Sequence, residues 1–329
     1  YISGLDVWIS STIILSFTLI YVLFGGLKAT IRSDGIQFIV IFLLFFYLIF
    51  SIFFQNNNNL NLNIFDKNFI KFDSKSLITS FQFGFVFFIA VAATNLFHQG
   101  NWQRVYAAKN DKVLVKSLLI SFVIIFVIVL SLGLTGSISK LNGLKFNEDL
   151  AFFSIILNKS DIFVSLIILI FSLCLTISTV DTLLNSISSL TIVHSKDFFN
   201  FKYLKDKKLS NIILILLSIL CLVIALYQLS VLYLFLLADL LCCACVYVIF
   251  KGLYQNKIYP NQSFILIMTG LSLGLLFFPS IDFSKSLLIG VIFDKSNFNE
   301  IFTNSLLFWS FLFATFSPMF FDIIYRRVK

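Results

Sequence analysis

Apolar runs of about 20 residues recur along most of this chain, and that repeat restricts the fold more than any other feature. A helix of that length crosses the hydrocarbon core of a bilayer. The chain is 59% hydrophobic and only 12% charged, which excludes an ordinary soluble domain. Because backbone polar groups in lipid must be paired within the segment, the sequence predicts an all-α polytopic membrane protein.

The apolar runs predict nine transmembrane helices in a single transmembrane domain over residues 1–329. They lie at about 8–27, 36–55, 79–103, 114–136, 162–193, 210–227, 229–251, 262–280 and 303–324. Two shorter stretches, 148–157 and 286–293, are expected to be interfacial or re-entrant.

The distribution of charge predicts the orientation. Nine spans place the two ends on opposite sides, and an outside N-terminus puts 16 of the 24 Lys and Arg residues in the cytoplasm, against 8 outside. The net charge of +8 is therefore explained by topology, and no nucleic acid or obligatory protein partner is expected. We expect an integral plasma (inner) membrane protein, embedded in the lipid bilayer, with its C-terminus in the cytoplasm.

The fifth predicted span carries a polar face. Its members are spaced three or four residues apart, so they share one side of a helix: Ser178, Asp181, Thr182, Asn185 and Ser189. A carboxylate at the bilayer centre costs about 2.5–3.5 kcal/mol on insertion scales. The face therefore indicates an ion or solute path, although serine and threonine hydroxyls in membrane helices also bond back to helix carbonyls.

Three short motifs accompany this face. They are Gly25, Gly26, Leu27, Ala29, Asp34 and Gln37; Gln103, Arg104, Ala107, Ala108 and Lys109; and Ser178, Thr179 and Asp181. In this order and spacing they resemble the sodium/solute symporter family, over about residues 1–252. The departures from the family pattern are Thr30, Ser33 and Thr182.

The resemblance implies a LeuT-type inverted-repeat helical bundle. Core helices four to ten would lie at about 8–251, followed by two additional C-terminal helices at about 262–280 and 303–324. The chain is then expected to be an N-terminally truncated fragment whose first three core helices precede it. The implied function is sodium-coupled symport of a small organic solute by alternating access, with Na⁺ as the coupling ion and no organic cofactor. Since no Walker loop, nucleophile elbow or metal-binding histidine pair occurs, no enzyme is expected.

The resemblance also implies a sodium site. It maps the hydroxyls of Ser178 and Thr179 and the backbone carbonyl of Leu175 onto the family's sodium ligands. Sodium prefers oxygen ligands, and hydroxyls with carbonyls supply them without burying several charges.

A second cation position is implied one turn further along. Asp181 and Thr182 would form it together with Asp34 of the first motif. Asp34 could have another role than cation binding, because it can cap a helix or pair with Arg32 or Lys28.

Four residues are candidates for solute binding: Thr94, Asn95, Gln99 and Asp239. The third span is expected to be interrupted at Thr94–Asn95 and again near Gly100, as family members unwind the matching helix. The alternative for Thr94, Asn95 and Gln99 is that they form the polar cytoplasmic end of a helix. Asp239 either lines the same cavity or pairs with a polar group on a neighbouring helix.

Two other functions fit the same residues. Symporter-like domains also serve as membrane sensors fused to signalling kinases. A proton-coupled carrier would instead titrate Asp181 or Asp239.

Overall fold

The computed structural model describes residues 4–54, 74–142, 151–157, 162–198, 206–228, 230–255, 259–281, 283, 285–288 and 306–328. Within them, secondary structure is helical apart from one isolated antiparallel bridge between Pro279 and Ser286. Nine helical segments there are long and apolar enough to cross a membrane. The predicted all-α polytopic fold class is confirmed. The predicted stretch 286–293 falls largely outside the described residues.

The helices group into two compact units. The first contains α1 (Val7–Phe54), α3 (Gln99–Tyr106), α4 (Asp111–Leu141), α5 (Ala151–Leu157), α6 (Ile162–Phe198) and α7 (Asp206–Leu226). The second contains α2 (Ser74–Phe97), α8 (Val231–Tyr254), α9 (Pro260–Phe277) and α12 (Leu306–Val328).

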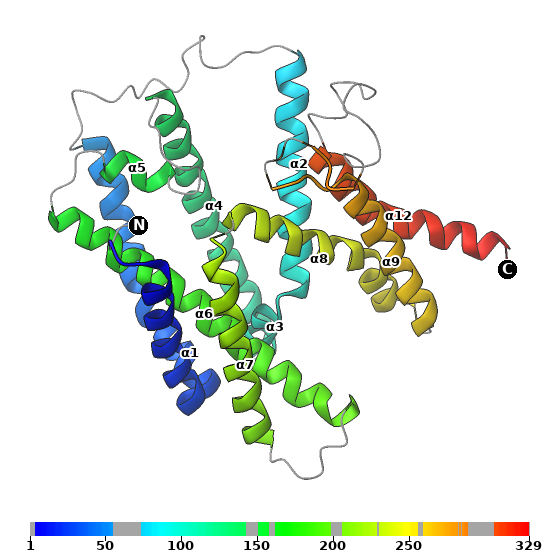
Figure 1. The fold of residues 1–329 in the computed structure, drawn as a ribbon, viewed down its shortest axis with the longest axis horizontal. Coiled ribbons are helices and arrows are strands. Elements are labelled where there is room, and N and C mark those ends of the chain that lie inside the picture. The colour runs from blue at the N-terminus through cyan, green and yellow to red at the C-terminus, as the bar shows by residue number, and fades with distance from the viewer. Residues whose placement is uncertain are drawn as a thin grey trace. The chain divides into compact units, whose positions relative to one another are not determined.

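The first two membrane spans are the two halves of α1. Gly26 interrupts the helix with φ 53° and ψ −150°, values that residues with a side chain rarely adopt. The chain reverses there, and the two halves run back along each other (Figure 1). The second span was predicted to begin at about residue 36, but it begins at Lys28. Within α1 only Gly26 has non-helical backbone angles, and Lys28–Ile31 are helical.

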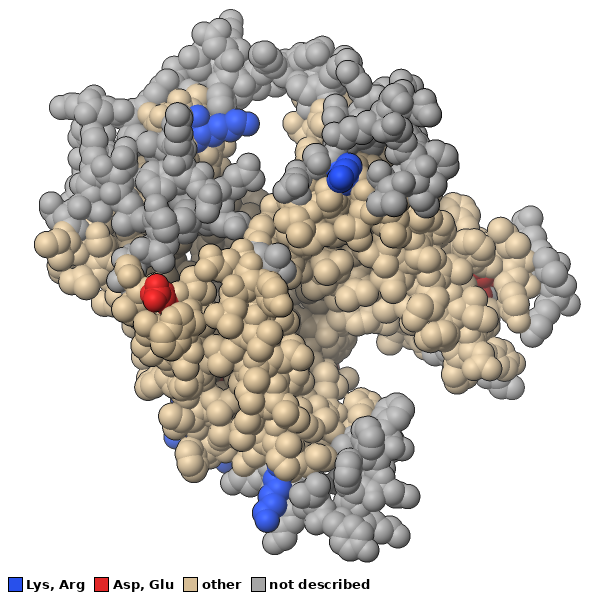
Figure 2. Space-filling model, in the orientation of Figure 1, with Lys and Arg blue, Asp and Glu red and all other residues tan. Residues whose placement is uncertain are grey.

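Around this hairpin, α6 and α7 pack against α1 and against each other. A buried cluster joins α1, α4, α5 and α6, and its core includes Leu48, Ile138, Ile155 and Ile168. By contrast, the outer surface of α4 is almost entirely exposed and apolar. The face in Figure 2 likewise carries few charged side chains among the described residues. Such a surface fits lipid rather than water.

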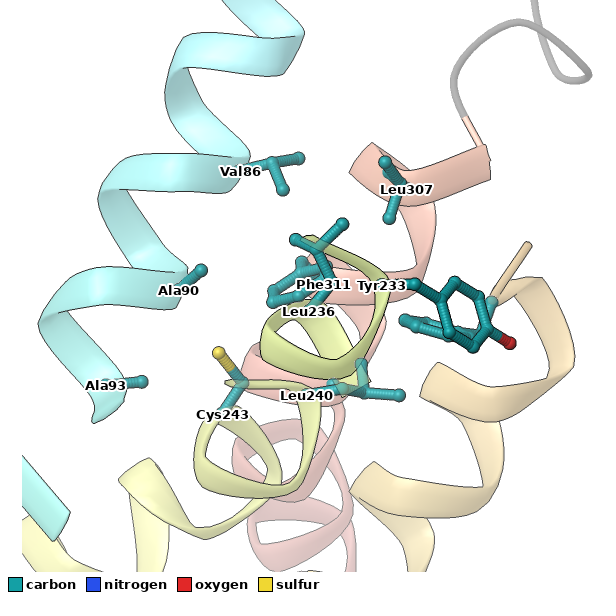
Figure 3. Close-up of a cluster of buried hydrophobic side chains, with 11 residues drawn as sticks. Val86, Ala90, Ala93, Tyr233, Leu236, Leu240, Cys243, Leu307 and Phe311 are labelled. Atoms are coloured by element: carbon teal, nitrogen blue, oxygen red, sulfur yellow. The ribbon is translucent and has the colours of Figure 1, made fainter. Parts of the chain in front are cut away.

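The second unit is built around α8. Figure 3 shows Val86, Ala90 and Ala93 on one face of α2, directed towards Leu236 of α8 and Phe311 of α12. All five side chains are buried. The alanines let α2 approach closely, which is how membrane helices gain contact where lipid supplies no hydrophobic drive.

Two glycines bring α9 against α12. A Cβ atom added at Gly270 would lie 2.8 Å from the backbone oxygen of Ala314, and one at Gly274 would lie 2.9 Å from the Cβ of Ala314. The Ser310 hydroxyl then donates to the Gly274 carbonyl at 2.7 Å. The Gly270–Gly274 spacing is the GxxxG pattern of close helix packing in membranes.

The third predicted span ends differently from the expectation. Helix α2 continues through Thr94 and Asn95 to Phe97, so the predicted interruption at Thr94–Asn95 is wrong. The Asn95 amide donates back to the Val91 carbonyl at 2.8 Å, which keeps this polar residue within the helix. The break occurs at His98, and α3 begins at Gln99.

Candidate functional site

Asp181 is the centre of a hydrogen-bonded group of hydroxyls in the first unit. Its side chain is fully buried on α6. The Tyr21 hydroxyl of α1 donates to its Oδ2 atom, and the Ser33 hydroxyl donates to the same atom at 3.2 Å. The Thr182 hydroxyl donates to Oδ1 at 3.3 Å. The polar face of α6 is therefore turned towards the hairpin of α1.

A second carboxylate lies beside this group. Asp34, in the second half of α1, accepts a hydrogen bond from the Ser178 hydroxyl at 3.0 Å and pairs with Arg104 of α3 at 2.7 Å. Arg104 also donates to Thr182 Oγ1 at 3.2 Å. Asp34 was expected to bind a cation, cap a helix or form an ion pair. The structure shows an ion pair, and its partner is Arg104 rather than Arg32 or Lys28.

This polar group has an unbalanced charge. It contains two carboxylates, Asp34 and Asp181, and one guanidinium, Arg104. Among the described residues, the ion pairs are Asp34–Arg104 and Asp322–Lys251, so Asp181 has no basic partner there. With both carboxylates ionised, the group carries one net negative charge. One monovalent cation or one proton neutralises it, which a site within a bilayer favours strongly.

The three residues mapped to the sodium site lie together on α6, but their hydroxyls are engaged. Thr179 Oγ1 donates to the Leu175 carbonyl at 2.7 Å and to the Thr176 carbonyl at 3.0 Å. That is the back-bonding expected for a membrane helix. Ser178 instead donates to Asp34, as described above. Each oxygen keeps lone pairs, so both hydroxyls remain able to face a cation if their protons turn away.

The polar face continues along α6 towards α3. Gln103 Nε2 donates to Ser189, and Asn185 Nδ2 lies 3.5 Å from Gln103 Oε1. The sequence placed these α6 residues on one face, and the structure shows that α3 covers it. Tyr21, Ser33, Gln103 and Arg104 were not predicted as site residues. Gln103 and Arg104 stand within the second motif, whereas no sequence signal marked Tyr21.

The solute candidates fall in different units. In the second unit, the Thr94 hydroxyl of α2 donates to Asp239 Oδ1 on α8, and Asp239 is only 7% exposed. Asn95 is exposed, next to Thr94. Gln99 belongs to the first unit, where it opens α3. The structure thus unites Thr94 with Asp239, and no lysine, arginine or histidine among the described residues forms an ion pair with Asp239.

A third acidic group was not predicted at all. Asp322 of α12 is fully buried and accepts hydrogen bonds at 2.6 Å from Tyr247 and Lys251 of α8 and from Gln262 of α9. These partners lie 60 to 75 residues before Asp322 in the sequence, so no local pattern predicts the contacts.

Comparison with known proteins shows similarity to a membrane transporter. The chain is 26% identical over 278 residues to the spermidine transporter DUR31 of Candida albicans strain SC5314. That similarity covers 80% of this chain and 50% of the relative, so the chain spans about half the length of the protein it matches. No family model and no solved structure matches. Together with the nine candidate spans, the similarity supports an integral multi-pass membrane protein related to a membrane transporter.

Proposed function

We propose that this chain is part of a sodium-coupled symporter that imports a small organic solute. The observation that carries the proposal is the net negative charge of the group formed by Asp34, Asp181 and Arg104. It lies beside two hydroxyls and a carbonyl of the kind that bind sodium, on Ser178, Thr179 and Leu175. The motif resemblance and the similarity to a transporter support the same interpretation.

Sodium ligation would replace some of the hydrogen bonds within this site. The Thr179 hydroxyl would release the Leu175 carbonyl, and both oxygens would face the ion. The Ser178 hydroxyl would turn its proton away from the ion, while Asp181 and Thr182 supply further oxygens nearby. Sodium entry then has an electrical as well as a chemical driving force, about 2.3 kcal/mol for each charge moved through 100 mV.

The solute proposed for the first tests is a polyamine, because the relative is named as a spermidine transporter. Asp239 offers the chemistry, since a buried carboxylate with a hydroxyl donor as its partner suits a protonated amine. Thr94 would orient the carboxylate, and Asn95 remains a candidate contact. Gln99 remains a separate candidate in the first unit. The proposed orientation has the N-terminal end of this chain outside and the C-terminal end in the cytoplasm, in the plasma (inner) membrane.

The test uses the complete protein, reconstituted in vesicles, with labelled spermidine. Replacing both hydroxyls, Ser178→Ala with Thr179→Ala, should raise the sodium concentration for half-maximal uptake about tenfold or more, because each lost ligand costs about 1 kcal/mol. Thr176→Ala is the matched control, since that hydroxyl is exposed on the same helix and bonds to the Ser172 carbonyl. Unchanged sodium dependence in the double variant would refute the sodium site.

Proton coupling is the second candidate, and the same charge imbalance favours it, because a proton also neutralises Asp181. Uptake measured with a sodium gradient at fixed pH, and then with a pH gradient without sodium, separates the two. Sodium coupling requires uptake in the first condition. Uptake confined to the second condition would assign the coupling to protons.

A further inference from the structure

The turn between α3 and α4 carries exposed aromatic and basic side chains in the first unit. We call residues 102–116 the α3–α4 elbow. The Ala107 amide closes α3 by donating to the Gln103 carbonyl at 3.0 Å, and Asn110 caps α4 by accepting from the Val113 amide at 2.8 Å. Because both helix ends are hydrogen-bonded, the elbow has a defined backbone on which its side chains form a surface.

The inner side of α3 is tied to its neighbours, which leaves the opposite side facing outward. Arg104 pairs with Asp34 of α1 at 2.7 Å. Trp102 and Tyr106 stand two residues before and two residues after Arg104, so both project from the far side of the helix. Their ring centroids are 6.2 Å apart, and Tyr106 is 81% exposed. Aromatic rings with a polar tip are typical of the headgroup region of a membrane.

Three lysines follow this aromatic pair. Lys109, Lys112 and Lys116 are all exposed, and none of them forms an ion pair with any residue that the structure describes. Lys112 and Lys116 are four residues apart, so they share one face of α4. One turn further, the same face presents Leu119 and Ile120, which are exposed as well. The lysines are therefore continuous with a lipid-facing surface, and they border lipid rather than protein.

The length of α4 places these lysines at the level of the headgroups. No charged residue stands between Lys116 and Lys140, and those 24 steps cover about 36 Å of helix, against about 30 Å for the hydrocarbon core. Lys116 thus lies at the edge of the hydrocarbon, and Lys112 lies one turn further out. Asp111 is the acidic residue of the elbow, so its three lysines leave a positive charge uncompensated.

We infer that the α3–α4 elbow binds an anionic phospholipid. The ammonium groups of Lys112 and Lys116 suit a phosphate with a net negative charge, and Trp102 with Tyr106 suits the apolar boundary below it. A zwitterionic lipid gains less, because its own cationic group meets the same lysines. In the proposed orientation this end is cytoplasmic, and the cytoplasmic leaflet carries anionic lipids. The inference does not depend on sodium coupling or on the solute.

The experiment measures which lipid gathers at the elbow. In the complete protein with its other cysteines replaced, Ala107→Cys carries a bimane fluorophore, since Ala107 is exposed between the aromatic pair and the lysines. The protein is reconstituted in phosphatidylcholine vesicles with the same fraction of doxyl-labelled phosphatidylglycerol or doxyl-labelled phosphatidylcholine. Quenching should show that the site prefers phosphatidylglycerol about tenfold or more. Equal quenching by the two labelled lipids would overturn the inference.

A pair of variants separates this surface from the general positive charge of the protein. Lys112→Gln with Lys116→Gln should remove most of the preference for phosphatidylglycerol. Lys28→Gln with Lys208→Gln is the matched control, because it removes the same charge from two exposed lysines on α1 and α7. The control should keep the preference within about twofold of the parent. Equal losses in the two double variants would assign the effect to overall charge and refute a site at the elbow.

Two further measurements test the chemistry of the ligand. Raising the salt from about 0.1 M to about 1 M shortens the Debye length from about 10 Å to about 3 Å, so the preference should fall. A preference unaffected by salt would show that charge does not select the lipid. Soluble glycerol phosphate should not reduce the quenching, and displacement by it would make free phosphate the ligand. Quenching requires no transport, so this result is decided separately from the proposed function.

Discussion

Asp181 and Asp322 are both fully buried, yet their surroundings differ in kind. In the second unit, Lys251 neutralises Asp322, and Tyr247 and Gln262 complete its hydrogen bonds at 2.6 Å. In the first unit, Asp181 receives hydroxyls alone. Asp322 is balanced by a lysine, whereas Asp181 has no basic partner among the described residues.

We propose that this contrast separates a structural charge from a functional one. A buried pair with all its hydrogen bonds made holds α8, α9 and α12 together and has no affinity left for an ion. A carboxylate solvated by hydroxyls is held in place without being neutralised, so it retains its affinity for a cation or proton. The predictions below test that division, beginning with the largest effect.

The first prediction concerns the balanced carboxylate. Asp322→Ala leaves the Lys251 ammonium buried without a counter-charge, and removal of one partner of a buried pair costs about 3–5 kcal/mol. We expect a large loss of thermal stability in detergent, measured as the unfolding midpoint of the purified protein. The double variant Asp322→Ala with Lys251→Met removes both charges and should recover most of that loss. If the single and double variants are equally unstable, Asp322 is not held by its charge.

The second prediction sharpens the same region. Gly270→Val places a side chain where even a Cβ meets the Ala314 oxygen at 2.8 Å, so α9 must move away from α12. Overpacking costs about 1–3 kcal/mol, and the displacement also draws Gln262 away from Asp322. Gly84→Val on α2 is the control, since an added Cβ there meets nothing within 4 Å. Equal loss of stability in both variants would mean that α9 and α12 do not depend on close approach.

The third prediction concerns the unbalanced carboxylate. Asp181→Asn keeps the size of the side chain and an oxygen that accepts from Tyr21 and Ser33, but removes the charge. We expect stability within about 1 kcal/mol of the parent. The apparent affinity for the coupling cation in spermidine uptake should fall about tenfold, equivalent to ~1.4 kcal/mol. A variant that is unstable but keeps its cation dependence would give Asp181 the structural role assigned here to Asp322.

The membrane spans were predictable because each depends on a local property, an apolar run of sufficient length. The polar face of α6 was equally predictable from helical periodicity, and the structure confirms that Ser178, Asp181, Thr182 and Ser189 engage neighbouring helices. The position of Asp34 near this face was also predicted, but from the motif resemblance and not from periodicity.

What the sequence did not predict depends on pairs distant along the chain. Tyr21 reaches Asp181 across 160 residues, and Lys251 reaches Asp322 across 71. No periodicity relates such residues, and a tyrosine in an apolar span looks like any other aromatic. The first span was predicted to end at about residue 27, next to the reversal at Gly26. The early start of the second helix was not predicted, because the polar residues after Gly26 fit a loop and a helix equally well.

The smallest predicted effect provides the baseline for the others. Ser188 of α6 and Ser210 of α7 are buried and bond to each other without any charge. Ser188→Ala with Ser210→Ala removes both partners together, so no buried donor is left unpaired, and a neutral bond between membrane helices averages ~0.6 kcal/mol. The unfolding midpoint should therefore shift only slightly, far less than in Asp322→Ala. A shift as large as that one would show that neutral and ionic contacts contribute alike in this protein, and the distinction between Asp181 and Asp322 would lose its energetic basis.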